Sequence, residues 1–230
     1  MKKYLLLVFS SFHVVSDPNN LRENEYFLCY ENLLRLNPSN FDICFVDNTT
    51  KSIDQLQNKR LKELLNGNRH ILYDNNIGVE NKGLGELDML RQAANLINLD
   101  DYCYIGYLTG RRLITCNYIF DKMMALNKEA LISNPPIIRV CDGEVFPPTP
   151  NLYNDMFFSM CPQTIKKYIQ FSFPYLNGLI NNIGSEQILY KFINENNISY
   201  EWMPSLGFIR NDWNSISDTY NLDYKNFQFC

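Results

Sequence analysis

Residue patterns that bind metals are scarce in this chain of 230 residues. It has only two histidines, His13 and His70, and none of its seven cysteines forms a C-x-x-C pair. Zinc sites need clustered cysteine and histidine ligands at short spacings, so no zinc-type site is expected. The dispersed cysteines lie mostly inside apolar runs, which is typical of buried, reduced thiols in a cytoplasmic protein.

Long apolar runs and an excess of positive charge are also missing. No segment approaches the roughly 18 apolar residues that a membrane-spanning helix needs. The run Met1–Phe9 is short and ends without a small-residue cleavage site, so it predicts a buried first strand rather than a signal peptide. The net charge of −4 argues against a nucleic-acid partner, because binding to a phosphate backbone needs clustered Lys and Arg.

Three nucleotide-binding patterns are absent. The P-loop pattern G-x-x-x-x-G-K-[ST] does not occur. The run Gly83-x-Gly85-x-x-Asp88 lacks the third glycine of the dinucleotide fingerprint and lies too far after its strand. The first strand ends in Ser10-Ser11-Phe12-His13, not in the glycine-rich arginine loop of sugar-nucleotide pyrophosphorylases. These absences disfavour NAD enzymes, P-loop enzymes and those pyrophosphorylases.

Strand-length apolar runs alternate with helix-period segments through the first half. We expect strands at Lys3–Phe9, Phe41–Val46, Ile71–Tyr73 and Tyr102–Tyr107, and helices at Arg22–Leu36, Ile53–Leu65 and Gly85–Leu96. This alternation predicts an α/β fold with a mainly parallel, Rossmann-like sheet flanked by helices.

The second half is less regular. We expect helices at Gln163–Phe171 and Ser185–Asn194 and short strands at Ile137–Cys141, Val145-Phe146 and Ser199–Met203. The chain contains no repeat, linker or low-complexity tract, so the sequence predicts a single domain.

Polar, glycine-containing segments follow two of the expected strands. After Ile71–Tyr73 come Asp74-Asn75-Asn76-Ile77-Gly78 and Asn81-Lys82-Gly83-Leu84-Gly85-Glu86-Leu87-Asp88. The strand Tyr102–Tyr107 ends in Tyr107-Leu108-Thr109-Gly110-Arg111-Arg112. Ligands of open α/β sheets bind beyond the carboxyl ends of the strands. Amides, one lysine and two arginines at that edge favour a ligand that carries phosphate.

The order of these segments resembles the GT-A class of nucleotide-diphosphate-sugar glycosyltransferases over most of the chain. In that class the first strand opens the donor site and the second ends beside the nucleotide base, which corresponds here to Val8–Ser11 and Asp47-Asn48. A third strand ending in asparagine, then a glycine-bearing turn and a helix, corresponds to Asn75 through Gly85. The run Leu108-Thr109-Gly110-Arg111 is similar to a signature of bacterial and viral polysaccharide glycosyltransferase-like proteins.

The resemblance implies a division of the domain into two halves and a set of donor-binding residues. Residues 1–115 would form the nucleotide-sugar-binding half and residues 116–230 the acceptor-side half. The donor-binding residues would be Ser10, Ser11, Asp47, Asn48, Asn75, Lys82, Asp88, Thr109, Gly110 and Arg112.

The chain departs from this class at the metal-binding motif. GT-A enzymes usually carry Asp-x-Asp after the fourth strand, where it holds Mg²⁺ or Mn²⁺ on the diphosphate, but this chain has Tyr107-Leu108-Thr109. We therefore expect no cofactor, and Mg²⁺ or Mn²⁺ is not favoured. Arg111 is the first candidate to stabilise the leaving diphosphate, with Arg112 and Lys82 behind it.

Each of these charged candidates has an alternative role. An arginine here could instead anchor a helix end or a surface carboxylate. Because neighbours on an extended segment point in opposite directions, we expect only one of Arg111 and Arg112 to face the site. Asp142 and Glu144 have a metal-like spacing, but the Asp-Gly pair favours a hairpin turn.

The best candidate for a catalytic base is Glu186. An inverting transferase needs a carboxylate near the acceptor hydroxyl, and many GT-A enzymes place it at the start of a helix in the second half. Glu186 opens such a helix, although a helix-start carboxylate is also favoured by the macrodipole. Asp155 and Asp142 are reserves. Trp202 and Trp213 would stack on acceptor sugars or pack in the core.

Taken together, the residues and the resemblance predict a cytoplasmic glycosyltransferase. It would move a hexose from a nucleotide-diphosphate sugar to the hydroxyl of a glycan or glycoconjugate acceptor, without a metal and with inversion. The alternative from another class is a non-catalytic module of the same fold that binds a nucleotide or a glycan.

Overall fold

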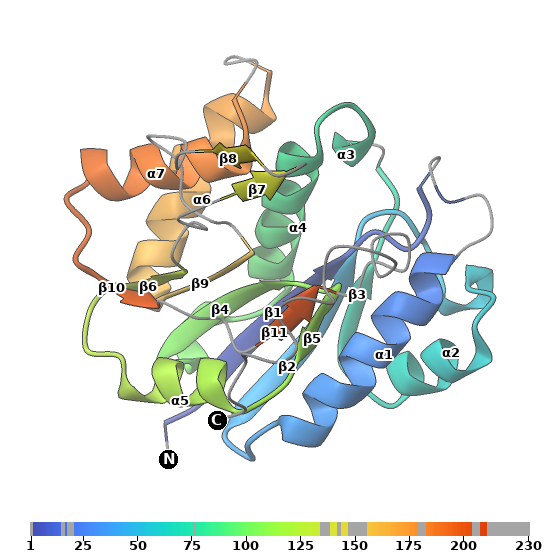
Figure 1. Cartoon of the computed structure of the whole chain (residues 1–230). Coiled ribbons are helices and arrows are strands. Elements are labelled where there is room, and N and C mark those ends of the chain that lie inside the picture. The colour runs from blue at the N-terminus through green and yellow to red at the C-terminus, as the bar shows by residue number, and fades with distance from the viewer. Residues whose placement is uncertain are drawn as a thin grey trace.

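The computed structural model of the chain describes residues 2–14, 17, 21–75, 77–133, 139–141, 144–146, 156–178, 183–203 and 208–210. Its centre is a seven-stranded sheet with the strand order β10-β6-β9-β4-β1-β2-β3 (Figure 1). In chain order the strands are β1 (Tyr4–Ser10), β2 (Phe41–Asp47), β3 (His70–Leu72), β4 (Tyr104–Thr109), β6 (Ala130–Ser133), β9 (Phe157–Met160) and β10 (Tyr200–Met203).

Most neighbouring strands run parallel. The central strand β1 is parallel to both β2 and β4, β2 is parallel to β3, and β6 is parallel to β10. Only β9, among the seven strands of this sheet, runs antiparallel to its neighbours β4 and β6. The predicted α/β fold with a mainly parallel sheet is confirmed, and strands from both halves of the chain build it.

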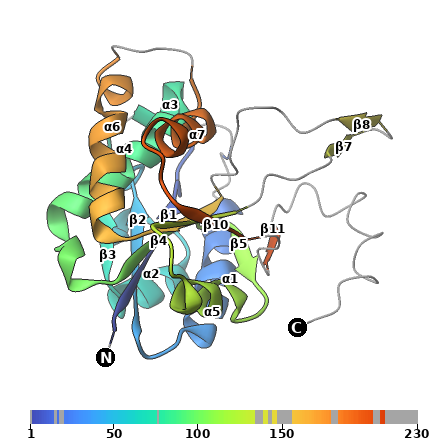
Figure 2. The same cartoon turned by 90° about the vertical axis from the view of Figure 1, so that its left-hand side faces the viewer.

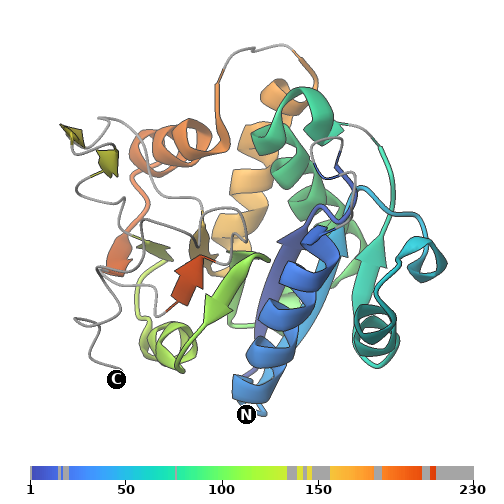
Figure 3. The ribbon, with the colours of Figure 1, turned by 45° about the vertical axis from the view of Figure 1, so that its right-hand side comes forward.

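Helices cover both faces of the sheet. Leu5, Leu7 and Phe9 of β1 pack on the core under α4 (Lys82–Leu96), α6 (Pro162–Leu176) and α7 (Ser185–Glu195). The alternate β1 residues Tyr4, Leu6 and Val8 pack under α1 (Leu21–Leu36), α2 (Lys59–Asn66) and α5 (Tyr118–Ala125) (Figures 2 and 3). A strand buried on both faces has no need of alternating polar residues, which explains the continuous apolar run of β1.

Two expected elements differ from the structure because of side-chain caps. The predicted helix over 53–65 is a 3₁₀ turn η1 (Ile53–Gln55) followed by α2, since the Asn58 side chain caps α2 by accepting the Leu61 amide. Helix α4 begins at Lys82 rather than Gly85 because Asn81 accepts the Leu84 amide. Both caps satisfy amides that a helix start leaves without partners.

The remaining elements are short. They are α3 (Ile77–Glu80), η2 (Leu99–Asp101) and the antiparallel pairs β5 (Arg112–Ile114) with β11 (Phe208–Arg210) and β7 (Arg139–Cys141) with β8 (Glu144–Phe146). The β7–β8 pairing places Cys141 opposite Glu144, as a hairpin requires, whereas Asp142 between them lies outside the described residues. No helix in the described ranges has the length and apolar character needed to cross a bilayer.

A close backbone approach fixes the start of α4 against its neighbours. A Cβ built on Gly85 would lie 2.7 Å from the Cα of Gly78 and 3.2 Å from Nδ2 of Asn48. A Cβ on Gly83 would lie 2.7 Å from the Ser185 amide nitrogen at the start of α7. Glycine at both positions therefore lets α3, α4 and α7 meet at one corner of the molecule.

Two glycine-to-alanine substitutions distinguish the effect of close packing at Gly85 from the general effect of replacing a glycine. Gly85→Ala should lower the free energy of unfolding by about 1–3 kcal/mol, since the overpacking outweighs the gain in helix propensity. Gly67→Ala is the control, because Gly67 has φ −85° and ψ −5° and a Cβ there meets nothing closer than 3.7 Å. It should stabilise the fold by about 0.4–1 kcal/mol. Urea denaturation measures both values, and equal effects would contradict the close approach.

Candidate functional site

The carboxyl ends of the first four sheet strands meet at one edge. Strands β1, β2, β3 and β4 end at Ser10, Asp47, Leu72 and Thr109. A cavity of about 500 Å³ opens there, within the range of about 300–1,000 Å³ typical of small-molecule sites. Its lining comes from the end of β1 and the loop after it, the start of α1, the loop after β2, the start of α4 and the turn after β4.

Most of the predicted site residues line this cavity. They are Ser10, Ser11, Asn48, Lys82, Thr109, Gly110, Arg111 and Arg112. Residues that the sequence did not single out also line it, among them His13, Arg22, Thr49 and Glu86. Glu86 follows Lys82 by four residues and so shares its helix face, a signal the sequence did contain.

The loop after β1 turns its backbone amides toward the protein. Three consecutive amides donate to side chains of neighbouring elements: Ser11 to Tyr26 Oη at 3.0 Å, Phe12 to Asp47 Oδ2 at 2.8 Å and His13 to Thr49 Oγ1 at 3.0 Å. These three amides are therefore committed inside the protein and do not point at an anion in the cavity, unlike the amides of loops that surround a phosphate.

Asp47 lies beneath the cavity and does not line it. Its side chain is fully buried, and Oδ1 accepts hydrogen bonds of 2.8 Å from both the amide and the hydroxyl of Thr49. Burial raises the pKa of this carboxyl, and the hydrogen bonds oppose that shift. Instead of contacting a nucleoside directly, as predicted, Asp47 joins the loop after β1 to the loop after β2.

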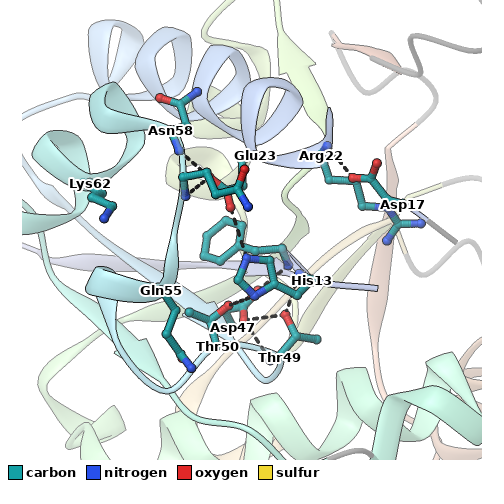
Figure 4. A network of polar contacts seen from close by, with 12 residues as sticks. His13, Asp17, Arg22, Glu23, Asp47, Thr49, Thr50, Gln55, Asn58 and Lys62 are labelled. Atoms are coloured by element: carbon teal, nitrogen blue, oxygen red, sulfur yellow. Dashed lines mark hydrogen bonds and ion pairs between the residues drawn. The ribbon is translucent and has the colours of Figure 1, made fainter. Parts of the chain in front are cut away.

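A second buried carboxylate fixes the imidazole of His13. Glu23, which is 1% exposed, accepts the amides of Gln57 and Asn58 at 2.7 and 2.6 Å. It also lies 3.1 Å from His13 Nε2, while His13 Nδ1 lies 3.4 Å from Thr50 Oγ1 (Figure 4). Both ring nitrogens thus have partners, and His13 contributes an oriented ring to the cavity wall.

Three arginines line the side of the cavity that faces α1. Arg22 comes from α1, Arg111 from the turn after β4 and Arg112 from the first position of β5. Arg111 lies 3.4 Å from the Glu25 carboxylate, and Arg112 Nε donates to Thr109 Oγ1 at 3.1 Å. The expectation that only one of the adjacent arginines faces the site is wrong, because Gly110 and Arg111 form a turn rather than an extended segment.

The side of the cavity formed by α4 carries opposite charges in a pair. Lys82 Nζ lies 2.9 Å from Glu86 Oε1, and the two belong to adjacent turns of the helix. The Lys82 side chain is 77% exposed, whereas that of Glu86 is 9% exposed. The two sides therefore differ in charge: the side formed by α1 and the segment after β4 supplies three arginines, and the side formed by α4 supplies a buried carboxylate.

Two predicted residues lie behind the cavity instead of lining it. The buried Asp88 carboxylate accepts hydrogen bonds from Asn75 Nδ2, from Tyr73 Oη at 2.9 Å and from Arg91 at 2.7 Å. Asn75 therefore turns toward Asp88 rather than toward a ligand. This network holds the loop after β3 against α4.

Glu186 lies in the first turn of α7 and is partly buried. The close approach of Ser185 to Gly83 brings this helix start to the end of α4 that carries Lys82, although Glu186 does not line the cavity. The reserve carboxylates Asp142 and Asp155, and also Trp213, lie outside the described residues. Trp202 is 39% exposed on the edge strand β10, and it packs edge-on against Tyr200.

The residues that the structure describes contain no group of three or more His, Cys, Asp or Glu side chains arranged to hold a divalent metal ion. Thr109, Gly110, Arg111 and Arg112, which line the cavity at the end of β4 and just after it, offer no carboxylate oxygen of the kind that Mg²⁺ and Mn²⁺ prefer.

Comparison with known proteins identifies the fold. No protein-family model and no curated protein sequence matches the chain. The apo structure of mouse xyloside xylosyltransferase 1 matches with a TM-score of 0.53 and 12% identity over 87% of this chain and 85% of that one. The inositol-1-phosphate CTP transferase from T. maritima matches with a TM-score of 0.52 and 10% identity over 88% and 85%.

A further match covers only half of the matched protein. The bifunctional IspDF from Campylobacter jejuni has a TM-score of 0.52 and 11% identity over 89% of this chain and 50% of that chain. At such identities the likeness concerns the fold alone. The chain has a GT-A-like α/β fold.

Removal of the Asp47 carboxylate should loosen the floor of the cavity. Asp47→Ala leaves the Phe12 and Thr49 amides without their acceptor, so the free energy of unfolding should fall by roughly 2–4 kcal/mol. The exposed Asp54 provides the control, and Asp54→Ala should change the free energy of unfolding by less than about 0.5 kcal/mol. Equal unfolding midpoints in urea for the two variants would show that Asp47 does not join the loops.

Proposed function

We propose that the chain is a glycosyltransferase that moves a hexose from a nucleotide-diphosphate sugar to a glycan hydroxyl, without a metal and with inversion. The observation that carries the proposal is the group of arginines at the carboxyl edge of a GT-A-like sheet, around a cavity of about 500 Å³. Arginine forks match the geometry of phosphate oxygens and keep their charge at every physiological pH.

The arginines would stabilise the leaving group as the glycosidic bond breaks. Negative charge then develops on the diphosphate, and donors already oriented toward it lower the barrier without reorganising. Thr109 orients Arg112 through its 3.1 Å hydrogen bond, and Glu25 restrains Arg111. The sugar passes through an oxocarbenium-like state, as glycosyl chemistry generally does.

Sugar transfer is favoured over nucleotidyl transfer by the loop after β1. A CTP transferase and a xylosyltransferase are both among the structural matches, so the fold does not separate the two reactions. The glycine-rich arginine loop of sugar-nucleotide pyrophosphorylases is absent, and the Ser11, Phe12 and His13 amides, which follow β1, donate inward. These three amides therefore do not serve as donors to a triphosphate.

The first test is turnover of the donor. The chain is incubated with UDP-, GDP-, ADP- and CDP-hexoses, with and without oligosaccharide acceptors, and release of the nucleoside diphosphate is measured. Release that an acceptor accelerates supports the glycosyltransferase. Binding of a nucleotide sugar without any release would support the alternative of a non-catalytic module. Absence of binding to both the nucleotide sugars and the oligosaccharides would contradict both proposals.

Arg112→Ala should lower kcat by on the order of 10²-fold, the scale of removing one oriented transition-state donor. Arg111→Lys should have a similar effect, since it keeps a charge beside buried Glu25 but loses the bidentate fork. The exposed Arg35 on α1 is the control, and Arg35→Ala should leave kcat unchanged. Melting temperatures confirm that each variant is folded.

The same assays, repeated in EDTA and with added Mn²⁺, test the proposed independence of metal. Equal rates in the two conditions are expected. Loss of turnover in EDTA with rescue by Mn²⁺ would contradict metal independence, and unchanged kcat in both arginine variants would remove the arginines from the mechanism.

Glu186 would accept the proton of the attacking hydroxyl. Glu186→Gln keeps the size of the side chain but removes its basicity at neutral pH, so transfer should be largely lost while donor affinity is retained. Glu195→Gln at the exposed end of the same helix is the matched control. If Glu186 serves the helix macrodipole alone, the variant should lose about 0.3–1 kcal/mol of stability and retain normal transfer.

A further inference from the structure

The Glu86 carboxylate lies in the cavity wall with half of its hydrogen-bonding capacity unused. Its side chain is 9% exposed, and Oε1 lies 2.9 Å from Lys82 Nζ. Its other oxygen, Oε2, is buried and has no hydrogen-bond partner among the described residues. A buried carboxylate oxygen without a donor is destabilising relative to one that is satisfied.

The ion pair with Lys82 does not explain why a carboxylate is buried here. The Lys82 side chain is 77% exposed, and ion pairs with so exposed a partner contribute little to stability. The terminal torsion of a glutamate is also soft, so the carboxylate can present either oxygen to the cavity at small cost. A bound molecule that supplies a hydrogen-bond donor would therefore relieve the unsatisfied oxygen.

The charges around the cavity determine which part of a ligand lies beside Glu86. A phosphate is repelled by the carboxylate and attracted by Arg22 of α1, Arg111 of the turn after β4 and Arg112 of β5. Glu86 comes from α4, which covers the opposite face of the sheet. A ligand with phosphates at the arginines thus places an uncharged portion, rich in hydroxyl groups, against α4.

We propose that Glu86 accepts a hydrogen bond from a sugar hydroxyl of the bound nucleotide sugar and thereby selects ligands that carry this hydroxyl. The proposal rests on the proposed function and adds a specificity-determining residue to it. The hydroxyl belongs to the ribose or to the transferred hexose, which share this chemistry. An analogue without the hydroxyl leaves the carboxylate unpaired, the situation in which binding sites discriminate most strongly.

Discrimination between matched ligands measures this role directly. Among UDP, GDP, ADP and CDP, the diphosphate that binds the intact chain most tightly is compared by calorimetry with its 2′-deoxy and 3′-deoxy forms. The corresponding nucleotide glucose is compared with analogues that each lack one glucose hydroxyl. We expect the intact chain to disfavour one of these analogues by tenfold or more in Kd.

Glu86→Ala should bring that ratio close to one, and Glu86→Gln, which keeps one neutral acceptor oxygen, should give an intermediate ratio. Removal of the negative charge strengthens binding of every phosphate ligand alike, and this effect cancels in the ratio. Glu63→Gln is the control, because it makes the same chemical change on the exposed surface of α2 and should leave the ratio unchanged.

The outcomes separate the inference from the function on which it rests. Loss of discrimination against a deoxyribose analogue assigns Glu86 to the ribose, and loss against a deoxyglucose analogue assigns it to the hexose. Ratios that stay the same in both Glu86 variants overturn the inference but leave the glycosyltransferase proposal intact. If the intact chain binds none of the ligands, the proposed function and the inference fail together.

Discussion

The buried carboxylate of Asp47 connects the two loops on which the cavity depends. Oδ2 accepts the Phe12 amide, and Oδ1 accepts the Thr49 amide and hydroxyl, so one side chain joins the chain segments that leave β1 and β2. A charged group in so buried a position is costly, and its three hydrogen bonds at 2.8 Å offset that cost. The positions of His13 and Thr49 at the cavity follow from this connection.

The regular part of the fold could be predicted from the sequence, because β1, β2 and α1 have strong local signals. The continuous apolar run of β1 and the helical spacing of Tyr26, Tyr30 and Leu33 each specify one element. In contrast, β6 and β9 have four residues each, and the antiparallel position of β9 between β4 and β6 depends on contacts distant in sequence. No local pattern carries that information.

The site could be predicted to the level of the correct sheet edge. Arg111 and Arg112 closely follow the end of β4, Lys82 begins α4, and the structure places all three at the cavity. The directions of Asp47, Asn75 and Asp88 could not be predicted, since each turns toward partners that only the folded chain brings close. Arg22 was missed for the same reason: its position depends on the path of the chain between β1 and α1.

The inward direction of the Ser11, Phe12 and His13 amides has a consequence for how this cavity can evolve. A site that binds anions through its main chain keeps that property whatever its side chains are. Here the positive charge resides in Arg22, Lys82, Arg111 and Arg112, each of which a single codon change can replace. The sheet and its loops can therefore persist through a change of ligand, since the donors that define the ligand are separate from those that hold the fold.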